Sequence, residues 1–401
     1  MRILLINHFP LTGSGSGTYT RNVAVSLKKL GHEVCIIFPE NETGFERIQG
    51  IKMHPVFFTY LEKIDEALPF NFPCFTIHPR STATFGDLSK EEATEYMSAF
   101  EKAIEEETAN FKPDVIHGQH IWLLSLLGAK MSVPTVLTAH GTDLMGYQKW
   151  ERFVPYAKEA VQLAKGIVTI SKDTDELVQD LLPESIGKTQ IITNGYDTEI
   201  FYPEAVTRSD ILAEYGIMGE IDFLVMFAGK LTGFKGIDVL LDAAKLYEKS
   251  NIGTIATCIA GDGELMDNLK KQAEKLNLQN VYFLGHVDHS SLRKLYNVAD
   301  VSVVPSRREP FGLVAIEALA CGTPVVATNE GGLADIITAK VGTLVAVDDA
   351  KELAEGILKE LRCKGKEQRR EAAASYAREN YSQEKNTEML LSFYKKVLES
   401  V

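Results

Sequence analysis

The chain has 401 residues, more than the roughly 250–300 that a single hydrophobic core supports, so we expect two domains. Its net charge of −13, from 55 acidic and 42 basic residues, argues against nucleic acid and anionic membranes as partners, because both bind basic patches. No apolar run reaches the roughly 18 residues that a transmembrane helix needs, so we expect no transmembrane segment.

The five cysteines are far apart in the sequence, and no pair has the CxxC spacing of a metal or redox site. Buried, reduced thiols are the expected state, which is typical of the cytosol. The apolar run at the N-terminus is too short for a signal peptide and has no cleavage site. Together these features predict a cytoplasmic protein.

Short apolar runs alternate with amphipathic segments through the first half of the chain. A continuous apolar run indicates a strand whose sheet is covered by helices on both faces, and the intervening segments have the period of helices. We expect strands at residues 3–6, 33–38, 115–117, 135–138 and 166–170. We expect helices at residues 18–30, 90–110, 153–164 and 173–182.

The same alternation restarts in the second half. We expect strands at residues 223–228, 254–260, 281–284, 301–304 and 325–327. We expect helices at residues 236–249, 264–276, 290–298 and 313–321, and a charged, helical stretch at 350–401. Two successive βα series predict an α/β protein of two Rossmann-like, doubly wound domains. Turn-forming residues at 194–209 mark the junction.

Two segments of the first half depart from this pattern. Residues 67–86 are rich in Pro, Phe and Gly and have no clear period, which fits either a functional loop or a packed surface loop. Gly13-Ser-Gly15-Ser16-Gly17 follows the first strand and opens a helix, where free N–H groups suit a phosphate. A dinucleotide fingerprint would need G-x-G-x-x-G instead, and a tight turn without a ligand is the other alternative.

Three segments of the second half follow expected strands and therefore gather at the carboxyl edge of one sheet. Lys230 and Lys235 come after the first of these strands, where two cations beside a helix start can neutralise a diphosphate. Asp262 lies in the Gly-Asp-Gly-Glu turn after the next strand. The third segment runs from residue 309 to residue 317.

The third segment carries a carboxylate at each end. Glu317 is suited to accept two hydrogen bonds from a ribose diol, and Glu309 lies before the helix, within reach of sugar hydroxyls. The N–H groups of Phe311, Gly312 and Leu313 at the helix start can meet the same ligand. A solvated or capping glutamate is the simpler alternative for each carboxylate alone, and the nearby lysines argue against it.

Residues 309–328, EPFGLVAIEALACGTPVVAT, resemble the E-x7-E signature of the family-four retaining glycosyltransferases of GT-B fold. The Gly-rich first loop and residues 192–197, 229–236 and 260–264 resemble other family elements, in the same order along the chain. The resemblance implies two Rossmann-like domains facing each other across a cleft. Residues 1–200 would form the acceptor-side domain, residues 201–380 the domain that binds the nucleotide sugar, and residues 381–401 a helix packing back on the first domain.

The resemblance also implies a role for each donor-site residue. Glu317 would bind the donor ribose, Glu309 the transferred sugar, and Lys230 and Lys235 the diphosphate. The family usually has Arg at the position of Lys230, and Lys has no bidentate fork. The N–H groups of residues 15–17 and 311–313 would complete these contacts.

A histidine at the end of an expected strand is the candidate from the first domain. His140 opens the segment His-Gly-Thr-Asp, and in the resembling family a histidine there contacts the donor sugar and the reaction centre. A satisfied structural histidine is the alternative. His120, Thr142 and Arg80 are the expected acceptor-side residues, although a structural role for His120 is equally compatible with the sequence.

No metal and no cofactor are expected. Asp173-Thr-Asp175 has the D-x-D pattern of metal-dependent transferases, but acidic residues at a helix start are explained by the helix dipole. By analogy with the family, we expect a hexose or N-acetylhexosamine to pass from a UDP-sugar to a hydroxyl of a soluble, polar acceptor.

Other functions remain open. A GT-B-like epimerase or phosphorylase would share the architecture, and a non-catalytic sugar-nucleotide binding protein would share the donor site. The sequence also leaves open whether the chain forms a homodimer.

Overall fold

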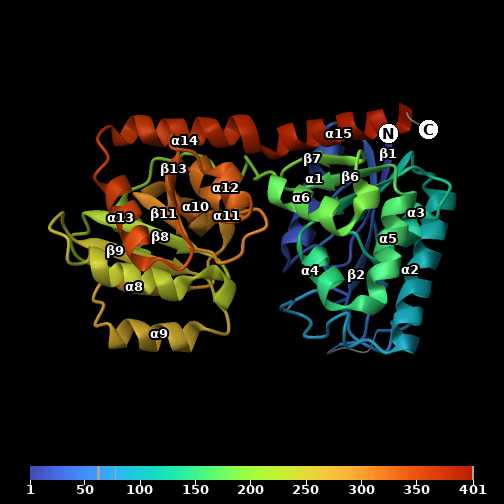
Figure 1. The fold of residues 1–401 in the computed structure, drawn as a ribbon, viewed down its shortest axis with the longest axis horizontal. Coiled ribbons are helices and arrows are strands. Elements are labelled where there is room, and N and C mark those ends of the chain that lie inside the picture. The colour runs from blue at the N-terminus through green and yellow to red at the C-terminus, as the bar shows by residue number, and fades with distance from the viewer. Residues whose placement is uncertain (61–63, 77, 400–401) are drawn as a thin grey trace. The chain divides into compact units, whose positions relative to one another are not determined.

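The computed structural model describes residues 1–60, 64–76 and 78–399. The chain forms two compact units, coloured along the sequence in Figure 1. Unit 1 consists of residues 1–193 and 386–401, and unit 2 consists of residues 194–385. Unit 2 is therefore a continuous stretch of chain, whereas unit 1 is built from both ends of the sequence.

Unit 1 is built on a seven-stranded parallel sheet with the order β3-β2-β1-β4-β5-β6-β7. Its strands are β1 (Arg2–Ile6), β2 (Glu33–Glu40), β3 (Lys52–Phe57), β4 (Val115–Gln119), β5 (Thr135–Ala139), β6 (Gly166–Thr169) and β7 (Thr189–Ile191). The strand order reverses between β1 and β4, which is the switch point where doubly wound folds bind ligands.

Helices cover both faces of this sheet. Successive side chains of a strand point to opposite faces, and both sets are therefore buried in the central strands. Leu4 and Ile6 of β1 join the core with α2, α3 and α5, whereas Ile3 and Leu5 join the core with α1 and α15. The helices of unit 1 are α1 (Gly15–Lys29), α2 (Lys90–Asn110), α3 (Leu123–Ala129), α4 (Thr142–Lys149), α5 (Val154–Leu163), α6 (Lys172–Leu181) and most of α15 (Gln383–Glu399).

Unit 2 repeats the plan with a six-stranded parallel sheet of order β10-β9-β8-β11-β12-β13. Its strands are β8 (Phe223–Ala228), β9 (Ile255–Ala260), β10 (Val281–Gly285), β11 (Val301–Val304), β12 (Val325–Thr328) and β13 (Gly342–Val345). Its helices are α7 (Arg208–Glu214), α8 (Ile237–Tyr247), α9 (Met266–Lys275), α10 (His289–Val298), α11 (Leu313–Ala320), α12 (Gly332–Ile336), α13 (Ala350–Leu361) and α14 (Lys366–Tyr381).

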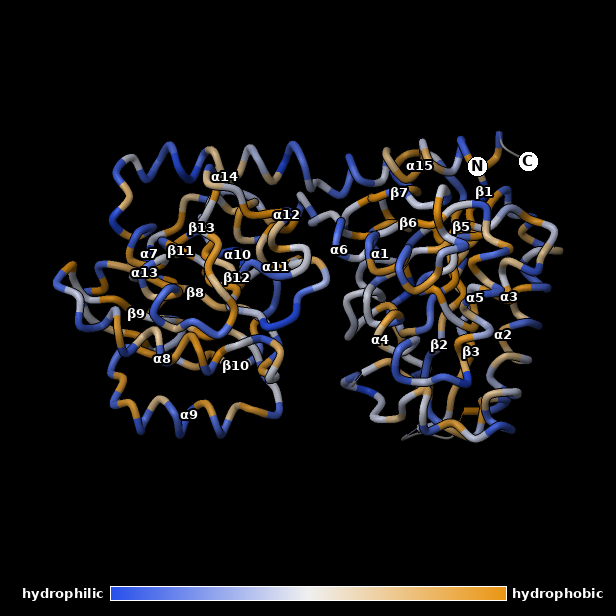
Figure 2. Tube along the Cα trace, viewed as in Figure 1, coloured by the Kyte–Doolittle hydropathy of each residue, from blue (hydrophilic) through white to orange (hydrophobic). Residues whose placement is uncertain are grey.

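Every strand expected from the sequence is present, and three unexpected strands lie at sheet edges. These are β3, β7 and β13, each with a neighbour on one side only. Edge strands do not need a continuous apolar run, and the sequences Lys-Met-His-Pro-Val-Phe, Thr-Gln-Ile and Gly-Thr-Leu-Val have none. Figure 2 shows apolar residues gathered along the central strands of each unit. Within the described residues, no helix is both long and apolar enough to span a bilayer.

Candidate functional site

The loops after β8, β9, β11 and β12 lie together at the carboxyl edge of the unit 2 sheet, and we call them the strand-end loops. Backbone hydrogen bonds join them: Leu231 N–H donates to the carbonyl of Asp262 at 2.9 Å, and Arg307 N–H donates to the carbonyl of Phe234 at 2.7 Å. Parallel strands end at the same edge, so the loops form one surface.

A glycine allows two of these loops to approach closely. Gly236 precedes α8 with φ of 65°, and a Cβ there would lie 1.9 Å from the carbonyl oxygen of Pro305. Only glycine adopts this conformation without strain and leaves room for that carbonyl. The contact brings Lys235, at the end of a 3₁₀ turn (η3, Gly233–Lys235), to the loop that carries Glu309.

Lys235 and Glu309 form an ion pair within the strand-end loops. Lys235 Nζ lies 2.5 Å from Glu309 Oε2, and Ser306 Oγ donates to the same carboxylate oxygen at 3.2 Å. Glu309 is 8% exposed, and these partners compensate for the water that its carboxylate loses on burial. The pair places a cation and a carboxylate acceptor side by side.

Two other cations of these loops, Arg307 and Lys230, differ in how they are held. Arg307 is paired with Asp238 at 2.6 Å and with Asp348 at 2.6 Å, which keeps its guanidinium on the protein. Lys230 is exposed and has no ion-pair partner within the described part of the chain. Lys230 is therefore free to meet an anionic ligand.

The helix α11 begins at the edge of the same loops without a side-chain cap. Gly312 is its N-cap, with φ of 110°, and Leu313 is its first residue. Phe311 is buried, with its ring centroid 6.3 Å from that of Tyr381. The uncapped N–H groups at this helix start are available to a polar ligand.

The carboxylates of Glu317 and Asp262 differ in whether they have a hydrogen-bond partner within the described protein. Burial raises the pKa of Glu317 to about 7, and its carboxylate has no hydrogen-bond partner among residues 1–60, 64–76 and 78–399. Asp262 is exposed, and its carboxylate accepts the N–H of Gly263 at 2.7 Å, so it shapes its own turn. Glu317 is thus the group of this pair that lacks a partner.

In unit 1, His140 follows β5 and is held in one tautomer. Its Nε2 lies 2.9 Å from the amide oxygen of Gln119, which can only accept, so Nε2 carries the proton and donates. Burial lowers the pKa of His140 to about 3, so the ring is neutral and Nδ1 is an acceptor. The ring of Tyr19 lies edge-on to His140, with centroids 5.1 Å apart.

His120 lies beside His140, with ring centroids 4.8 Å apart. It has a φ of 74°, which is unusual for a residue other than glycine and marks backbone strain at the end of β4. Burial lowers its pKa well below the usual value, and neither ring nitrogen has a hydrogen-bond partner among the described residues. By contrast, both nitrogens of His117 are satisfied, by Tyr394 and Thr138.

Two family descriptions match the sequence. Residues 218–380 match the family described as Glycosyl transferases group 1, and residues 13–200 match the Glycosyltransferase Family 4 description. The D-inositol 3-phosphate glycosyltransferase of Geodermatophilus obscurus is 30% identical over 350 residues, which cover 80% of this chain and 76% of that protein. The chain belongs to the group 1 glycosyltransferases.

Solved structures confirm the GT-B fold of this glycosyltransferase. The sucrose-phosphate synthase of Thermosynechococcus elongatus superposes with a TM-score of 0.77 at 22% identity, covering 100% of both chains. The Anabaena protein HepE, solved with UDP, superposes with a TM-score of 0.74 at 18% identity, covering 99% of this chain and 100% of that one. At these identities the likeness concerns the fold.

The Gly-rich loop of the glycosyltransferase is partly occupied by its own cap. Ser14 is the N-cap of α1, and its side chain accepts the N–H of Gly17 at 3.0 Å. A Cβ on Gly17 would lie 2.1 Å from the carbonyl oxygen of Pro10, so close packing explains this glycine. The N–H groups of Gly15 and Ser16 lie outside the cap.

The three expected acceptor-side residues differ in how they are held. Arg80 lies in the segment between β3 and α2, where its Nη1 is 2.5 Å from Glu40 and 3.1 Å from Glu42. Thr142 is the first residue of α4, two positions after His140. The structure therefore brings His120 close to His140 and holds the guanidinium of Arg80 on two carboxylates.

The D-x-D segment is accounted for by helix capping. Ser171 caps α6 by accepting the N–H of Thr174, and Asp175 accepts the hydroxyl of Thr169 at 2.9 Å. Within the described residues, no cluster of three or more His, Cys, Asp or Glu has the arrangement of a metal site.

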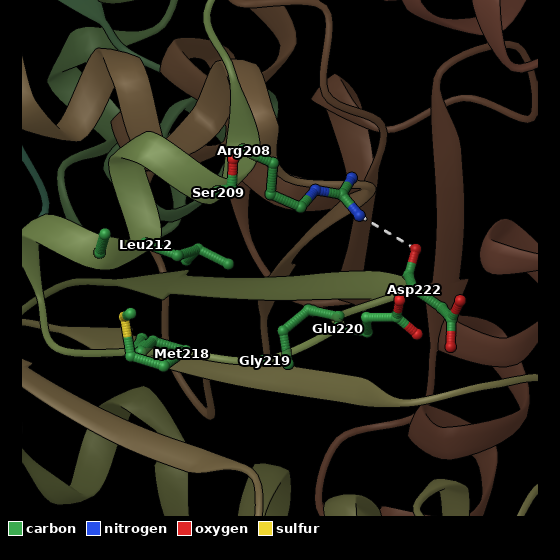
Figure 3. Close-up of a pocket in the computed structure, with 10 residues that line it drawn as sticks. Arg208, Ser209, Leu212, Met218, Gly219, Glu220 and Asp222 are labelled. Carbon is green, nitrogen blue, oxygen red and sulfur yellow. Dashed lines mark hydrogen bonds between the residues drawn. The ribbon is translucent and has the colours of Figure 1, made fainter.

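A hollow of about 730 Å³ lies beside α7 and the loop before β8 (Figure 3). Leu212, Met218 and Gly219 contribute to its lining, and Arg208 donates to the carbonyl of Asp222 at 3.0 Å. These residues precede β8, so the hollow lies at the amino end of that strand. The strand-end loops follow the carboxyl ends, and the hollow is separate from them.

Sequence reasoning missed three residues that orient these groups. Gln119 binds His140, Ser306 binds Glu309, and Asp143 accepts the N–H groups of His140 and Ile121 at 3.1 and 2.8 Å. Asp143 and Gln119 adjoin the histidines in the segments His-Gly-Thr-Asp and Gln-His, so adjacency to a candidate at a strand end was the available signal.

Proposed function

We propose that this glycosyltransferase is retaining and metal-independent, and moves a hexose or N-acetylhexosamine from a UDP-sugar to a hydroxyl of a soluble, polar acceptor. The observation that carries the proposal is the Lys235–Glu309 pair, a cation and a buried carboxylate 2.5 Å apart. A nucleotide sugar needs both groups, because its diphosphate is anionic and its sugar offers hydroxyl donors.

Unit 2 supplies the groups for the donor. Lys230 and Lys235 neutralise the diphosphate, and the uncapped start of α11 at residues 311–313 adds N–H donors. Glu309 accepts hydrogen bonds from hydroxyls of the transferred sugar. Glu317, whose carboxylate is otherwise unpaired, accepts the two hydroxyls of the ribose.

Unit 1 supplies groups for the reacting sugar and the acceptor. The N–H groups of Gly15 and Ser16 bind phosphate oxygens at the start of α1. His140, neutral and with Nδ1 as an acceptor, contacts a hydroxyl of the transferred sugar. His120 and Thr142 contact the acceptor, and Arg80 holds the segment between β3 and α2 through Glu40 and Glu42.

The reaction follows from these roles. The bond between the sugar C1 and the diphosphate oxygen breaks, positive charge develops on the ring, and the acceptor oxygen bonds to C1 on the same face. The departing phosphate oxygen takes the proton of the acceptor hydroxyl. Catalysis then consists of positioning and of stabilising the leaving diphosphate, for which Lys235 is the principal group.

UDP is proposed as the nucleotide on analogy alone. The Anabaena neighbour was solved with UDP, and UDP-sugars are common in the resembling family. A thermal-shift screen with UDP-, GDP- and ADP-sugars tests this choice, because a specific donor stabilises the fold by mass action. A larger rise in Tm with GDP- or ADP-sugars than with UDP-sugars would show that the donor carries guanine or adenine in place of uracil.

Three measurements test the rest of the proposal. Nucleotide release that depends on an acceptor supports transfer, whereas release of the nucleotide together with a free, epimerised sugar in the absence of an acceptor, with water taking the place of the acceptor, would indicate an epimerase. A product of inverted anomeric configuration, observed by proton NMR, would refute retention. Loss of activity with a chelator, restored by a divalent cation, would refute metal independence.

A further inference from the structure

Arg307, in the loop after β11, holds the turn that carries Lys235 at two points. Its backbone N–H donates to the carbonyl of Phe234 at 2.7 Å, and its Nη1 donates to the carbonyl of Gly233 at 2.7 Å. Both carbonyls belong to η3, the 3₁₀ turn that ends at Lys235. The main chain and the side chain of one arginine therefore bind two consecutive residues of the loop after β8.

Two carboxylates fix the guanidinium of Arg307 in this position. Asp238, in the first turn of α8, accepts from Nη1 and Nη2 at 2.9 and 2.6 Å, a two-pronged contact that an ammonium group cannot make. Asp348, in the loop after β13, accepts from Nε at 2.6 Å. The loops after β8, β11 and β13 therefore meet at one side chain.

Lys235 and Glu309 lie on the two segments that Arg307 joins. Lys235 directly follows the two carbonyls that Arg307 binds, and Glu309 lies two residues after Arg307 in the same loop. The contact of 2.5 Å between Lys235 Nζ and Glu309 Oε2 depends on the backbone of both loops, because neither residue lies in a strand of the sheet. The close approach of Gly236 to Pro305 joins the same two loops at a second point.

We propose that Arg307 is a positioning residue for the transfer reaction, holding η3 against the loop after β11 and thereby setting the position of Lys235 relative to Glu309. The inference rests on the proposed function and adds a residue that acts through Lys235, because two carboxylates and a carbonyl occupy its own guanidinium. A shift of Lys235 by about 1 Å would weaken its support of the leaving diphosphate, since such a misplacement can lower a rate about a hundredfold.

Arg208 is a matched control at the opposite end of the same strands. Its Nε donates to the carbonyl of Val298, its Nη1 to the carbonyl of Asp222 and its Nη2 to the carboxylate of Asp300, at 3.0, 3.0 and 2.7 Å (Figure 3). These partners precede β8 and β11, so Arg208 joins the amino ends of the two strands whose carboxyl ends Arg307 joins. The two arginine side chains are also equally exposed, at 29% and 30%.

The first experiment measures hydrogen exchange and needs no substrate. Arg307→Lys keeps the positive charge but loses the fork of donors, so η3 is held less firmly. We expect backbone amides in peptides that cover residues 229–236 to exchange about tenfold faster than in the wild type. Arg208→Lys should lower the Tm to a similar degree and leave exchange in this segment unchanged. Unchanged exchange in Arg307→Lys, or an equal acceleration in Arg208→Lys, contradicts the inference.

The second experiment measures nucleotide release from UDP-, GDP- and ADP-glucose, with water or an added sugar as the acceptor. Arg307→Lys should lower kcat about tenfold to a hundredfold and change the donor KM much less, because the charge of Lys235 remains while its placement is lost. Arg208→Lys should keep the wild-type kcat. In a Lys235→Ala background, Arg307→Lys should have little further effect, because the group that it positions is absent.

Each remaining outcome counts against a stated claim. An unchanged kcat in Arg307→Lys, or a loss of the same size in the Lys235→Ala background, overturns the inference and leaves the transferase function standing. Absence of nucleotide release from every donor overturns the proposed function and the inference with it. If Arg307→Lys does not fold, Asp348→Asn serves in its place, because asparagine tolerates the φ of 60° there and only one ion pair is removed. It should show the same pattern with smaller changes.

Discussion

The ammonium of Lys235 lies 2.5 Å from the carboxylate of Glu309, although 74 residues separate them in the sequence. The pair exists because the loops after β8 and β11 are adjacent, which the sheet order dictates. The lysine therefore has a carboxylate partner before any donor binds. Donor binding must share this lysine between the carboxylate and the diphosphate.

Replacing Lys235 with alanine should remove stabilisation of the leaving diphosphate. We expect kcat to fall by about 10²–10³-fold, the usual effect of deleting one preorganised electrostatic group. Steady-state nucleotide release with saturating acceptor measures it. Lys351→Ala, which breaks an exposed ion pair with Glu355, is the control and should keep full activity. Full activity in Lys235→Ala would remove this residue from the site.

The pKa of Glu317 predicts a pH dependence of donor binding. Burial raises this pKa from 4.5 to about 7, so the free protein gains a proton as the pH falls through neutrality. The ionised carboxylate accepts both ribose hydroxyls, so binding favours the deprotonated form. We expect the donor Kd to rise about tenfold per pH unit below 7, measured by calorimetry. Glu317→Gln should bind weakly with no such slope, and an equal slope in this variant would assign the titration elsewhere.

The Gln119–His140 hydrogen bond predicts the effect of one conservative change. In Gln119→Glu a carboxylate would face Nε2 of His140 and favour the imidazolium, raising a pKa that burial now holds at about 3. Activity should then fall with decreasing pH between 8 and 5, because the charged ring no longer offers a free acceptor. The wild-type His140 contributes no such titration. The pH–rate profiles of both proteins, together with the imidazole NMR signals of His140, test this prediction. The same profile for Gln119→Glu and the wild type would contradict it.

The close approach at Gly236 predicts a localised loss of stability. Gly236→Ala places a side chain at positive φ against the carbonyl of Pro305, which costs about 1–3 kcal/mol for the backbone conformation alone. Thermal unfolding should show a lower Tm, and the donor KM should rise because Lys235 is displaced. Gly233→Ala, with no atom within 4 Å of its added Cβ, should change neither quantity.

The central strands could be predicted because their apolar runs are continuous, as in Phe-Leu-Val-Met-Phe-Ala of β8. Three of the four edge strands, β3, β7 and β13, could not be predicted, because an edge strand does not need a continuous apolar run; the fourth, β10, was predicted because its run Val-Tyr-Phe-Leu is apolar. Among the candidate site residues, Lys235 and Glu309 could be named from the sequence, because their spacing and their positions after expected strands can be read there. Their hydrogen-bond states were not, because the pairing of Arg80 with Glu40 and the unpaired nitrogens of His120 depend on distant segments.

The core of unit 1 depends on a helix that comes from the other end of the chain. Its sheet is covered on one face by Leu390, Phe393, Tyr394 and Val397 of α15, and the hydroxyl of Tyr394 lies 2.6 Å from His117 Nδ1 in β4. Residues 194–385 form a unit from one continuous stretch of chain, whereas the sheet of unit 1 lacks one of its covering helices until α15 has been synthesised. The half of the protein that is synthesised first therefore needs, for its complete core, a helix that is synthesised after all of unit 2.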